Sequence, residues 1–334
     1  MLIFTEQELK QYVQLNNEAI AIVEAGFTKL AVDEAVMPPI MRVDLHDQNG
    51  EVDVKTAYVK GEDMFAIKVS SGFFNNYKLG LPSGNGLMLL ISTQTGIPQA
   101  ILLDNGYLTE VRTAAAGAIA ANYLSRKNIE TVGVIGAGSQ ARYQVRALKL
   151  VRDFKRILVY SRSEDRSRKY AVDMSAELGI EVQVAESAEA LVRNSDTVIT
   201  TTPAKEPVIK AEWLHPGLHI TAMGSDAEHK QELEAEVLAR ADKLICDTKA
   251  QCARLGELHH ALDKGILTNE SHVIELGQLT SGKLSGRVND EEITVCDLTG
   301  TGVQDTVIAL FAYTELVKRE IGLIVENKKM ALKN

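Results

Sequence analysis

A glycine-rich segment in the middle of the chain carries the residue pattern that binds a dinucleotide. The string VGVIGAGSQAR closes a predicted strand and opens a predicted helix, with Gly136, Gly138 and Ala141 in the spacing G-x-G-x-x-A. The first glycine permits a tight turn, the second lets the backbone approach a pyrophosphate, and the alanine allows close packing of helix and strand. The start of the helix offers N–H groups to the phosphates. The alternative is a glycine turn without a ligand, but strand, helix and next strand all occur in order.

The end of the next predicted strand indicates which nucleotide binds. An NAD-selective site usually places Asp or Glu there to accept a hydrogen bond from the ribose 2′-hydroxyl. This chain has Ser161, Arg162 and Ser163 in that region, and an arginine with flanking hydroxyls can neutralise a 2′-phosphate. The pattern favours NADP over NAD; the alternative is a solvated arginine that stacks on adenine and serves either cofactor. Further cofactor contacts are predicted at Ala137, Ser139, Gln140, Thr202, Met223, Gly224, Ser225 and Gly302.

Isolated cations in the first third of the chain suit a small carboxylate substrate. Arg42 follows Pro38-Pro39, Lys68 lies among apolar neighbours in FAIKVSS, and Arg112 opens a predicted helix, RTAAAGAIA. A carboxylate is best held by a bidentate guanidinium and a second cation. Taken singly, each is more often a structural ion pair or a solvated side chain. Lys68 is the most informative, because a charge inside an apolar strand costs free energy.

Asp226 is a candidate for proton transfer. It directly follows a predicted strand in ITAMGSDAEHKQEL, and ligands of doubly wound sheets bind at the carboxyl ends of strands. A carboxylate there could hold an amino group or relay a proton. The alternative is an N-cap for a helix predicted to start near residue 228.

The elements that would position these residues fall into two groups. Up to about residue 125 the chain mixes helices with strands: a helix capped by Thr5, a second helix over 19–32 that Pro38-Pro39 ends, and a helix over 112–124. Apolar runs predict strands at 52–59, 65–71, 86–92 and 101–104, with turns at Gly61, Asn75-Asn76, Gly84 to Gly86 and Gly96. From residue 130, strands and helices alternate, which predicts a parallel, doubly wound sheet. A final helix follows DLTGTG.

Length and composition exclude several classes of protein. The chain has 334 residues and a net charge of −9, and 45% of its residues are hydrophobic. At about 100–200 residues per domain, two domains are expected. The acidic balance disfavours nucleic acid, and we expect no membrane span and no signal peptide. Three cysteines without metal-like spacing and histidines without a metal pattern predict no metal site and a cytoplasmic protein.

Several segments together resemble the ornithine cyclodeaminase/mu-crystallin family. They are PPIMRVD, FAIKVSSGFFNN, GLPSGNGLMLL, LTEVRTAAAGA, VGVIGAGSQAR, VYSRS, GSDAEHKQEL and DLTGTGVQD, which span nearly the whole chain. The resemblance implies a homodimer with a Rossmann-type nucleotide domain over 126–305. It also implies an α+β substrate-binding and dimerisation domain over 1–125 and 306–334.

The resemblance also implies roles for individual residues. Arg42, Lys68 and Arg112 fall where the family holds the substrate carboxylate, and Asp226 falls where it has its catalytic carboxylate. Cyclodeaminases carry a glutamate upstream of the lysine, but Asp53 or Lys55 stands near that place here, which puts ornithine in doubt. The chain is more similar to the subgroup of ectoine-utilisation proteins and iminosuccinate reductases.

The leading hypothesis is an NAD(P)H-dependent reductase of a small 2-imino acid, running reversibly as an amino-acid dehydrogenase. In this hypothesis Lys68 and Asp226 are catalytic, and Lys55 or Lys78 would hold a second carboxylate, as in iminosuccinate. The alternatives are a cyclodeaminase, which releases ammonia without net use of cofactor, and a non-enzymatic ligand-binding protein like mu-crystallin.

Overall fold

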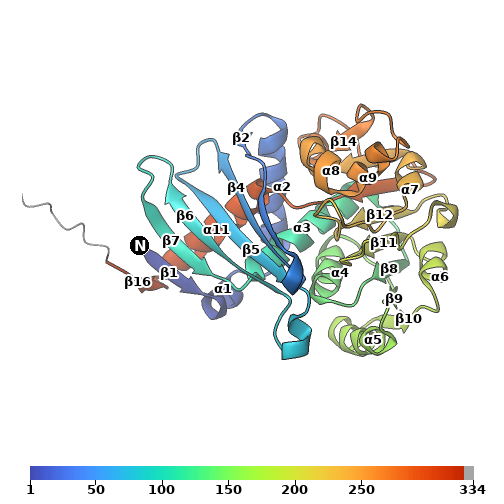
Figure 1. The fold of residues 1–334 in the computed structure, drawn as a ribbon, viewed down its shortest axis with the longest axis horizontal. Coiled ribbons are helices and arrows are strands. Elements are labelled where there is room, and N and C mark those ends of the chain that lie inside the picture. The colour runs from blue at the N-terminus through green and yellow to red at the C-terminus, as the bar shows by residue number, and fades with distance from the viewer. Residues whose placement is uncertain (327–334) are drawn as a thin grey trace, which may run out of the picture. The chain divides into compact units, whose positions relative to one another are not determined.

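The computed structural model describes residues 1–326, and contacts between residues divide the chain into two compact units (Figure 1). Unit 1 comprises Met1–Gln14, Asp33–Arg112 and the described part of Thr301–Asn334. Unit 2 comprises Leu15–Val32 and Thr113–Gly300. The predicted domains differ from this division, because they assign residues 15–32 and 113–125 to the first domain and 301–305 to the second.

Unit 1 is a mixed eight-stranded sheet with helices against one face. Its strand order is β16-β1-β7-β6-β5-β4-β2, and β3 pairs with β4. The last helix, α11 (Gly302–Val317), packs on β4 and β5, where Thr306 Oγ1 accepts from the N–H of Ala66 and donates to the carbonyl of Ala57. The strands are β1 (Leu2–Thr5), β2 (Ala35–Val36), β3 (Met41–Leu45), β4 (Gly50–Val59), β5 (Met64–Phe73), β6 (Gly84–Ser92), β7 (Pro98–Leu103) and β16 (Leu323–Ile324).

The four predicted strands are present as β4 to β7. The predicted cap Thr5 precedes α1 (Glu6–Tyr12), where it forms a capping box with Glu8. One predicted helix end and one predicted turn are wrong. The second helix, α2 (Asn17–Ala31), ends before β2, so Pro38-Pro39 does not terminate it. Gly84 to Gly86 lie inside β6, where a Cβ on Gly86 would come within 2.8 Å of the Val69 carbonyl oxygen. Close strand approach therefore explains that glycine.

The helix that contains Arg112 also starts earlier than predicted. It is α3 (Tyr107–Leu124), so Arg112 lies in its second turn. The carboxylate of Asp104 accepts a hydrogen bond of 2.8 Å from the Leu108 N–H, which satisfies a donor in the first turn. The helix can therefore begin directly after the turn at Asn105.

Unit 2 is the predicted doubly wound domain. All strands of its eight-stranded sheet run parallel, in the order β10-β9-β8-β11-β12-β15-β13-β14. The strands are β8 (Thr131–Ile135), β9 (Arg156–Tyr160), β10 (Glu181–Val184), β11 (Thr197–Thr200), β12 (His219–Ala222), β13 (Lys243–Cys246), β14 (Val273–Glu275) and β15 (Thr294–Asp297). The order reverses between β8 and β11, where such sheets bind ligands at the strands' carboxyl ends.

Helices accompany this sheet as the alternation predicted, with some additions. α4 (Ser139–Val151), α5 (Glu164–Leu178) and α6 (Ala188–Arg193) confirm the predicted helices. The sequence did not predict α7 (Ala235–Ala239), α8 (Lys249–Leu255) or α10 (Leu276–Thr280) as separate helices. α9 (Glu257–Asp263) contains His259 and His260, for which the sequence predicts a surface helix. Within residues 1–326, no helix has the length and apolar character needed to cross a membrane.

Candidate functional site

A buried cation cluster lies in unit 1, and we define it by Lys55, Lys68, Arg112 and Asp305. Lys55 on β4 and Lys68 on β5 are direct cross-strand neighbours, and both are buried. Lys68 Nζ lies 2.9 Å from Asp305 Oδ2, and Arg112 Nε donates to Asp305 Oδ1 at 2.9 Å. Lys68 and Arg112 thus share one carboxylate, and together they exceed its charge. Such a pair of cations suits an additional anion.

Burial and neighbouring charges alter the acidity of these groups. Burial first, then the charges of Arg112 and Lys55, lower the pKa of Lys68 to about 7, against the opposing effect of Asp305. Burial alone would raise the pKa of Asp305, but the cations around it hold that pKa below its usual value. Burial raises the pKa of Asp104, the carboxyl that caps α3, and the charge of Lys68 opposes that shift. Lys68 is therefore poised to change charge near neutral pH.

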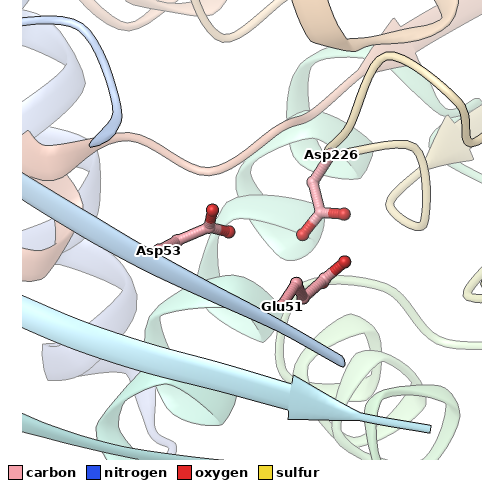
Figure 2. Close-up of side chains that lie close together, drawn as sticks. All are labelled: Glu51, Asp53 and Asp226. Carbon is pink, nitrogen blue, oxygen red and sulfur yellow. The ribbon is translucent and has the colours of Figure 1, made fainter. Parts of the chain in front are cut away.

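Arg42 lies on β3 among acidic side chains. Its guanidinium contacts Asp44 at 3.0 Å, Asp53 at 3.3 Å and the carboxylate of Glu51. Glu51 and Asp53 alternate along β4 and so project from the same face of the strand (Figure 2). Three carboxylates surround this cation, whereas Lys68 and Arg112 share one. The role of Arg42 in binding a substrate carboxylate stays a prediction.

The turn after β8 in unit 2 fits a dinucleotide phosphate. Gly136 has φ +121°, and a Cβ there would lie 2.5 Å from Thr201 Oγ1. Gly138 is the N-cap of α4, and a Cβ on it would meet no atom within 4 Å. Gly138 has no side chain that could cap α4, and Ala137, Ser139 and Gln140 border this helix start. The cofactor contacts themselves stay predictions.

The three predicted cofactor residues in the loop after β9 differ in what their side chains contact. Ser163 is the N-cap of α5, where its side chain accepts from the Arg166 N–H. Ser161 Oγ donates to the Ser163 carbonyl at 2.9 Å. Both serines therefore shape the loop, while the side chain of Arg162 is exposed. Of the three, only Arg162 is exposed, and its contact with a nucleotide stays a prediction.

The loop after β12 is folded on itself by its own side chains. Lys230 is buried, and its Nζ lies 2.7 Å from Oδ1 of Asp226, whose side chain is one-third exposed. Ser225 Oγ donates to the Lys230 carbonyl at 2.6 Å. The helix predicted from residue 228 does not form, so Asp226 is no N-cap and that alternative is wrong. Met223, another predicted cofactor contact, packs partly buried against the core of unit 2.

Three residues that the sequence did not single out hold candidate site residues in place. Asp305 pairs with Lys68 and Arg112, and Lys230 pairs with Asp226. The third is Glu232, which accepts hydrogen bonds from the predicted cofactor residues Thr202 and Gly224. Gly302, also predicted to contact the cofactor, begins α11, where a Cβ would lie 2.1 Å from the Thr56 carbonyl oxygen. Close packing on β4 explains the glycine at that position.

Some related sequences are named dehydrogenases and one is named a cyclodeaminase. A protein of Rhizobium meliloti provisionally named a dehydrogenase is 49% identical over 98% of this chain and 99% of its own length. An uncharacterised cyclodeaminase of Sinorhizobium fredii is 48% identical, with the same coverage. The alanine dehydrogenase of Archaeoglobus fulgidus is 37% identical over 96% of this chain and 97% of its own length.

Solved structures of related enzymes share the fold over nearly the full chain. The Δ1-pyrroline-2-carboxylate reductase of Thermococcus litoralis, in complex with NADH and L-proline, has a TM-score of 0.92 at 33% identity, covering 97% of this chain and all of that one. An archaeal alanine dehydrogenase dimer with bound NAD has a TM-score of 0.90 at 34% identity, covering 98% and 99%. The iminosuccinate reductase of Paracoccus denitrificans with NAD⁺ has a TM-score of 0.88 at 30% identity, with the same coverage.

These comparisons confirm the resemblance and the Rossmann-type fold class that the motifs predicted. The family model also matches residues 2–320, which include every candidate site residue described above. The chain therefore belongs to the ornithine cyclodeaminase/mu-crystallin family.

Proposed function

We propose that this chain is a nicotinamide-dependent reductase of a small 2-imino acid, which runs in reverse as an amino-acid dehydrogenase. The observation that carries the proposal is the sharing of one carboxylate, Asp305, by two buried cations, Lys68 and Arg112. Unit 2 of the same chain has a glycine turn at Gly136 and a helix start at Gly138 that fit the phosphates of a dinucleotide. Relatives named as reductases and dehydrogenases of imino or amino acids support this chemistry.

In the proposed reaction, residues of this chain bind the substrate and transfer the proton. Arg112 and Lys68 bind the α-carboxylate, with Arg42 as a third predicted contact. A nicotinamide cofactor whose pyrophosphate is held by Gly136, Gly138 and the start of α4 would supply the hydride that reduces the imine carbon. Asp226 relays a proton to the imine nitrogen, so that C=N becomes CH–NH. The ammonium of Lys68 stabilises the charge of the bound substrate, in a site whose donors are already oriented.

The substrate proposed is a dicarboxylate such as iminosuccinate. Lys55 stands directly across from Lys68, and its charge contributes to the lowered pKa of Lys68. Lys55 would supply the cation for a second carboxylate on the substrate. The similarity to the iminosuccinate reductase of Paracoccus denitrificans supports the same substrate.

The cofactor proposed is NADP in preference to NAD. The exposed guanidinium of Arg162 follows β9, at the position where an NAD-selective site usually has a carboxylate. The related structures contain NADH or NAD, so the preference has to be measured on this chain.

The proposal is tested by turnover with oxaloacetate and ammonia. We expect oxidation of NADPH, and more slowly of NADH, together with formation of aspartate. Asp226→Asn should lower kcat by about 10²-fold while it leaves cofactor binding nearly unchanged, because the carboxamide cannot relay the proton. If no cofactor is oxidised with any of a panel of 2-oxo acids plus ammonia, the proposal is overturned.

A cyclodeaminase is the second candidate, favoured by the 48% identity to a protein that carries that name. The two reactions differ in stoichiometry. A cyclodeaminase releases ammonia from ornithine and leaves the cofactor concentration unchanged, whereas a reductase consumes one NAD(P)H per product. Measuring ammonia and NAD(P)H in the same reaction separates them.

We also propose that the chain forms a homodimer through the face of the unit 1 sheet opposite α11. Cross-strand neighbours on this face are apolar and only partly buried, as the pairs Val54–Val69 and Ile67–Leu89 illustrate. An open apolar sheet face of this kind is usually covered by a partner. The face comprises Met41, Val43, Val52, Val54, Ile67, Val69, Leu87, Leu89 and Ile101.

A further inference from the structure

Glu232 is a buried carboxylate with four donors around it. Its Oε1 accepts from the N–H of Thr202 at 2.5 Å and from Thr202 Oγ1 at 2.7 Å. Its Oε2 accepts from the N–H of Gly224 at 2.7 Å and from Thr200 Oγ1 at 2.6 Å. The side chain is completely buried. A buried carboxylate is costly unless it is hydrogen-bonded, and here each oxygen has one N–H and one hydroxyl donor.

The two N–H donors belong to two different loops. Thr202 follows β11 and Gly224 follows β12, and these strands are neighbours in the sheet. Both loops leave the carboxyl ends of their strands, the edge where a doubly wound sheet binds its nucleotide. One carboxylate therefore ties together two loops that are predicted to contact the cofactor.

The approach of the two loops is close enough to require glycine. A Cβ on Gly224 would lie 2.1 Å from the carbonyl oxygen of Thr202 and 2.7 Å from Glu232 Oε2. Real Cβ atoms do not approach so closely, so a larger residue at 224 would push the loops apart. The spacing of the loops is thus set by Glu232 and permitted by Gly224.

Glu232 is itself held by a second buried carboxyl. Glu257, at the start of α9, accepts from the backbone N–H of Glu232 at 2.7 Å and of Leu233 at 3.0 Å. Asp297, at the end of β15, accepts from the N–H of Leu258 at 3.0 Å. Three acidic side chains in succession therefore connect the sheet, the start of α9 and the two loops. These hydrogen bonds fix the position of Glu232 relative to the sheet and to α9.

We propose that Glu232 is a positioning residue that fixes the loops after β11 and β12 in the arrangement that binds the nicotinamide cofactor. This inference rests on the proposed function. A preformed loop pair need not be ordered on binding, so the free-energy cost of binding falls. A carboxylate that served only the stability of the sheet would not need its N–H donors in the two loops.

Glu232→Gln tests the inference, because it keeps the size of the side chain but replaces one acceptor oxygen with an amide nitrogen. One loop N–H then loses its acceptor, and binding of NADH and NADPH, measured by fluorescence titration, should weaken by about tenfold or more. At saturating cofactor, KM for the imino acid should stay within about twofold, because its binding residues are untouched.

Thr200→Val is the matched control. It removes one hydrogen bond from the same carboxylate, but its donor lies within β11 and touches neither loop. We expect a loss of thermal stability with cofactor affinity unchanged within about twofold, since both loop N–H groups keep their acceptor. Equal loss of cofactor affinity in Thr200→Val and Glu232→Gln would overturn the inference.

Gly224→Ala is the second variant, and it decides the question if Glu232→Gln does not fold. It keeps the carboxylate and separates the loops, so cofactor binding should again weaken while the substrate residues of unit 1 are unchanged. Unaltered cofactor affinity in Gly224→Ala, or in folded Glu232→Gln, overturns the inference and leaves the proposed function standing. If the unmodified protein binds neither NADH nor NADPH, the proposed function itself fails.

Discussion

Lys68 and Arg112 converge on Asp305 from a strand and a helix, and all three side chains are buried. Charges in such a place interact strongly, because little water screens them. Lys68 loses part of its proton affinity to burial and to Arg112, whereas Asp305 keeps its negative charge. A substrate carboxylate would add a second negative charge and restore the proton affinity of Lys68.

The pH dependence of kcat/KM should report the charge of Lys68. With a pKa of about 7, Lys68 is an ammonium below pH 7 and a neutral amine above it. Because kcat/KM reflects the free enzyme, we expect it to fall as pH rises through about 7. Lys68→Arg keeps its charge at all these pH values, so the fall should disappear in that variant. An identical fall in Lys68→Arg would assign the titration to another group.

Unfolding does not explain such a fall. An unfolded lysine keeps its ordinary pKa of 10.5, so between pH 7 and 10.5 the unfolded chain binds more protons at Lys68 than the folded one. Stability rises with pH wherever the unfolded state binds more protons. The contribution of Lys68 to the free energy of unfolding therefore increases over the range in which activity is expected to decline. Denaturant titrations at pH 7 and 9 provide the check.

Arg162 should decide between the two cofactors. If its guanidinium pairs with a 2′-phosphate, Arg162→Ala weakens NADPH binding by about 1–3 kcal/mol, because a charge-assisted contact is lost. NADH lacks that phosphate and should bind nearly as before. Dissociation constants for both cofactors give the measurement. Equal losses would mean that Arg162 stacks on adenine or supports the loop.

The sequence revealed the cations of the site but not the carboxylates that hold them. Lys68 stands out because its strand neighbours are apolar, whereas Asp305 resembles any acidic residue in the first turn of a helix. The two lie 237 positions apart, and only the packing of α11 on β5 joins them. Glu232 was missed for a related reason, because the N–H donors that explain it come from two loops, 8 and 30 residues away in the sequence.

Prediction of the elements succeeded where the local pattern was long. α4 and α5 have 13 and 15 residues, enough turns for apolar periodicity to show, and Ser163 marks the start of α5. α7, α8 and α10 have only five to seven residues each, too few to show a period, whereas the equally short α6 is marked by its N-cap Ser187. The helix predicted from residue 228 does not form, because the backbone N–H groups of Glu232 and Leu233 donate to the Glu257 carboxylate instead of to a preceding turn.

The tight packing of α11 on the unit 1 sheet should make Gly302 important for stability. Gly302→Ala places a methyl group about where the Thr56 carbonyl oxygen lies, so α11 has to shift away from β4. We expect the free energy of unfolding to fall by about 1–3 kcal/mol, as for other overpacked sites. Gly84→Ala is the control, since a Cβ there meets no atom within 4 Å. A similar small loss in both variants would contradict tight packing at Gly302.

Across the whole molecule, the chain passes between the units more often than its sequence indicates. α2 belongs to unit 2, where it packs on α10 and Thr28 Oγ1 donates to Thr280 Oγ1 at 2.8 Å. A Cβ on Gly277 would lie 2.4 Å from the Phe27 carbonyl oxygen, so the two helices are in close contact. These partners are about 250 residues apart, and amphipathicity alone does not say which core a helix joins.

A charge on the apolar sheet face of unit 1 should separate the proposed homodimer. The apolar sheet face of unit 1 lies opposite α11, and Ile67 stands near its middle, between Thr56 of β4 and Leu89 of β6. Ile67→Lys places a charge in the proposed interface, where removing an unpaired charge from water costs free energy. Sedimentation velocity should therefore show a monomer for this variant and a dimer for the unmodified chain. Val172→Lys on α5, at a side chain already 70% exposed, should leave the dimer intact. A dimer that persists in Ile67→Lys would place the interface on another surface, and a monomeric unmodified chain would remove the proposal altogether.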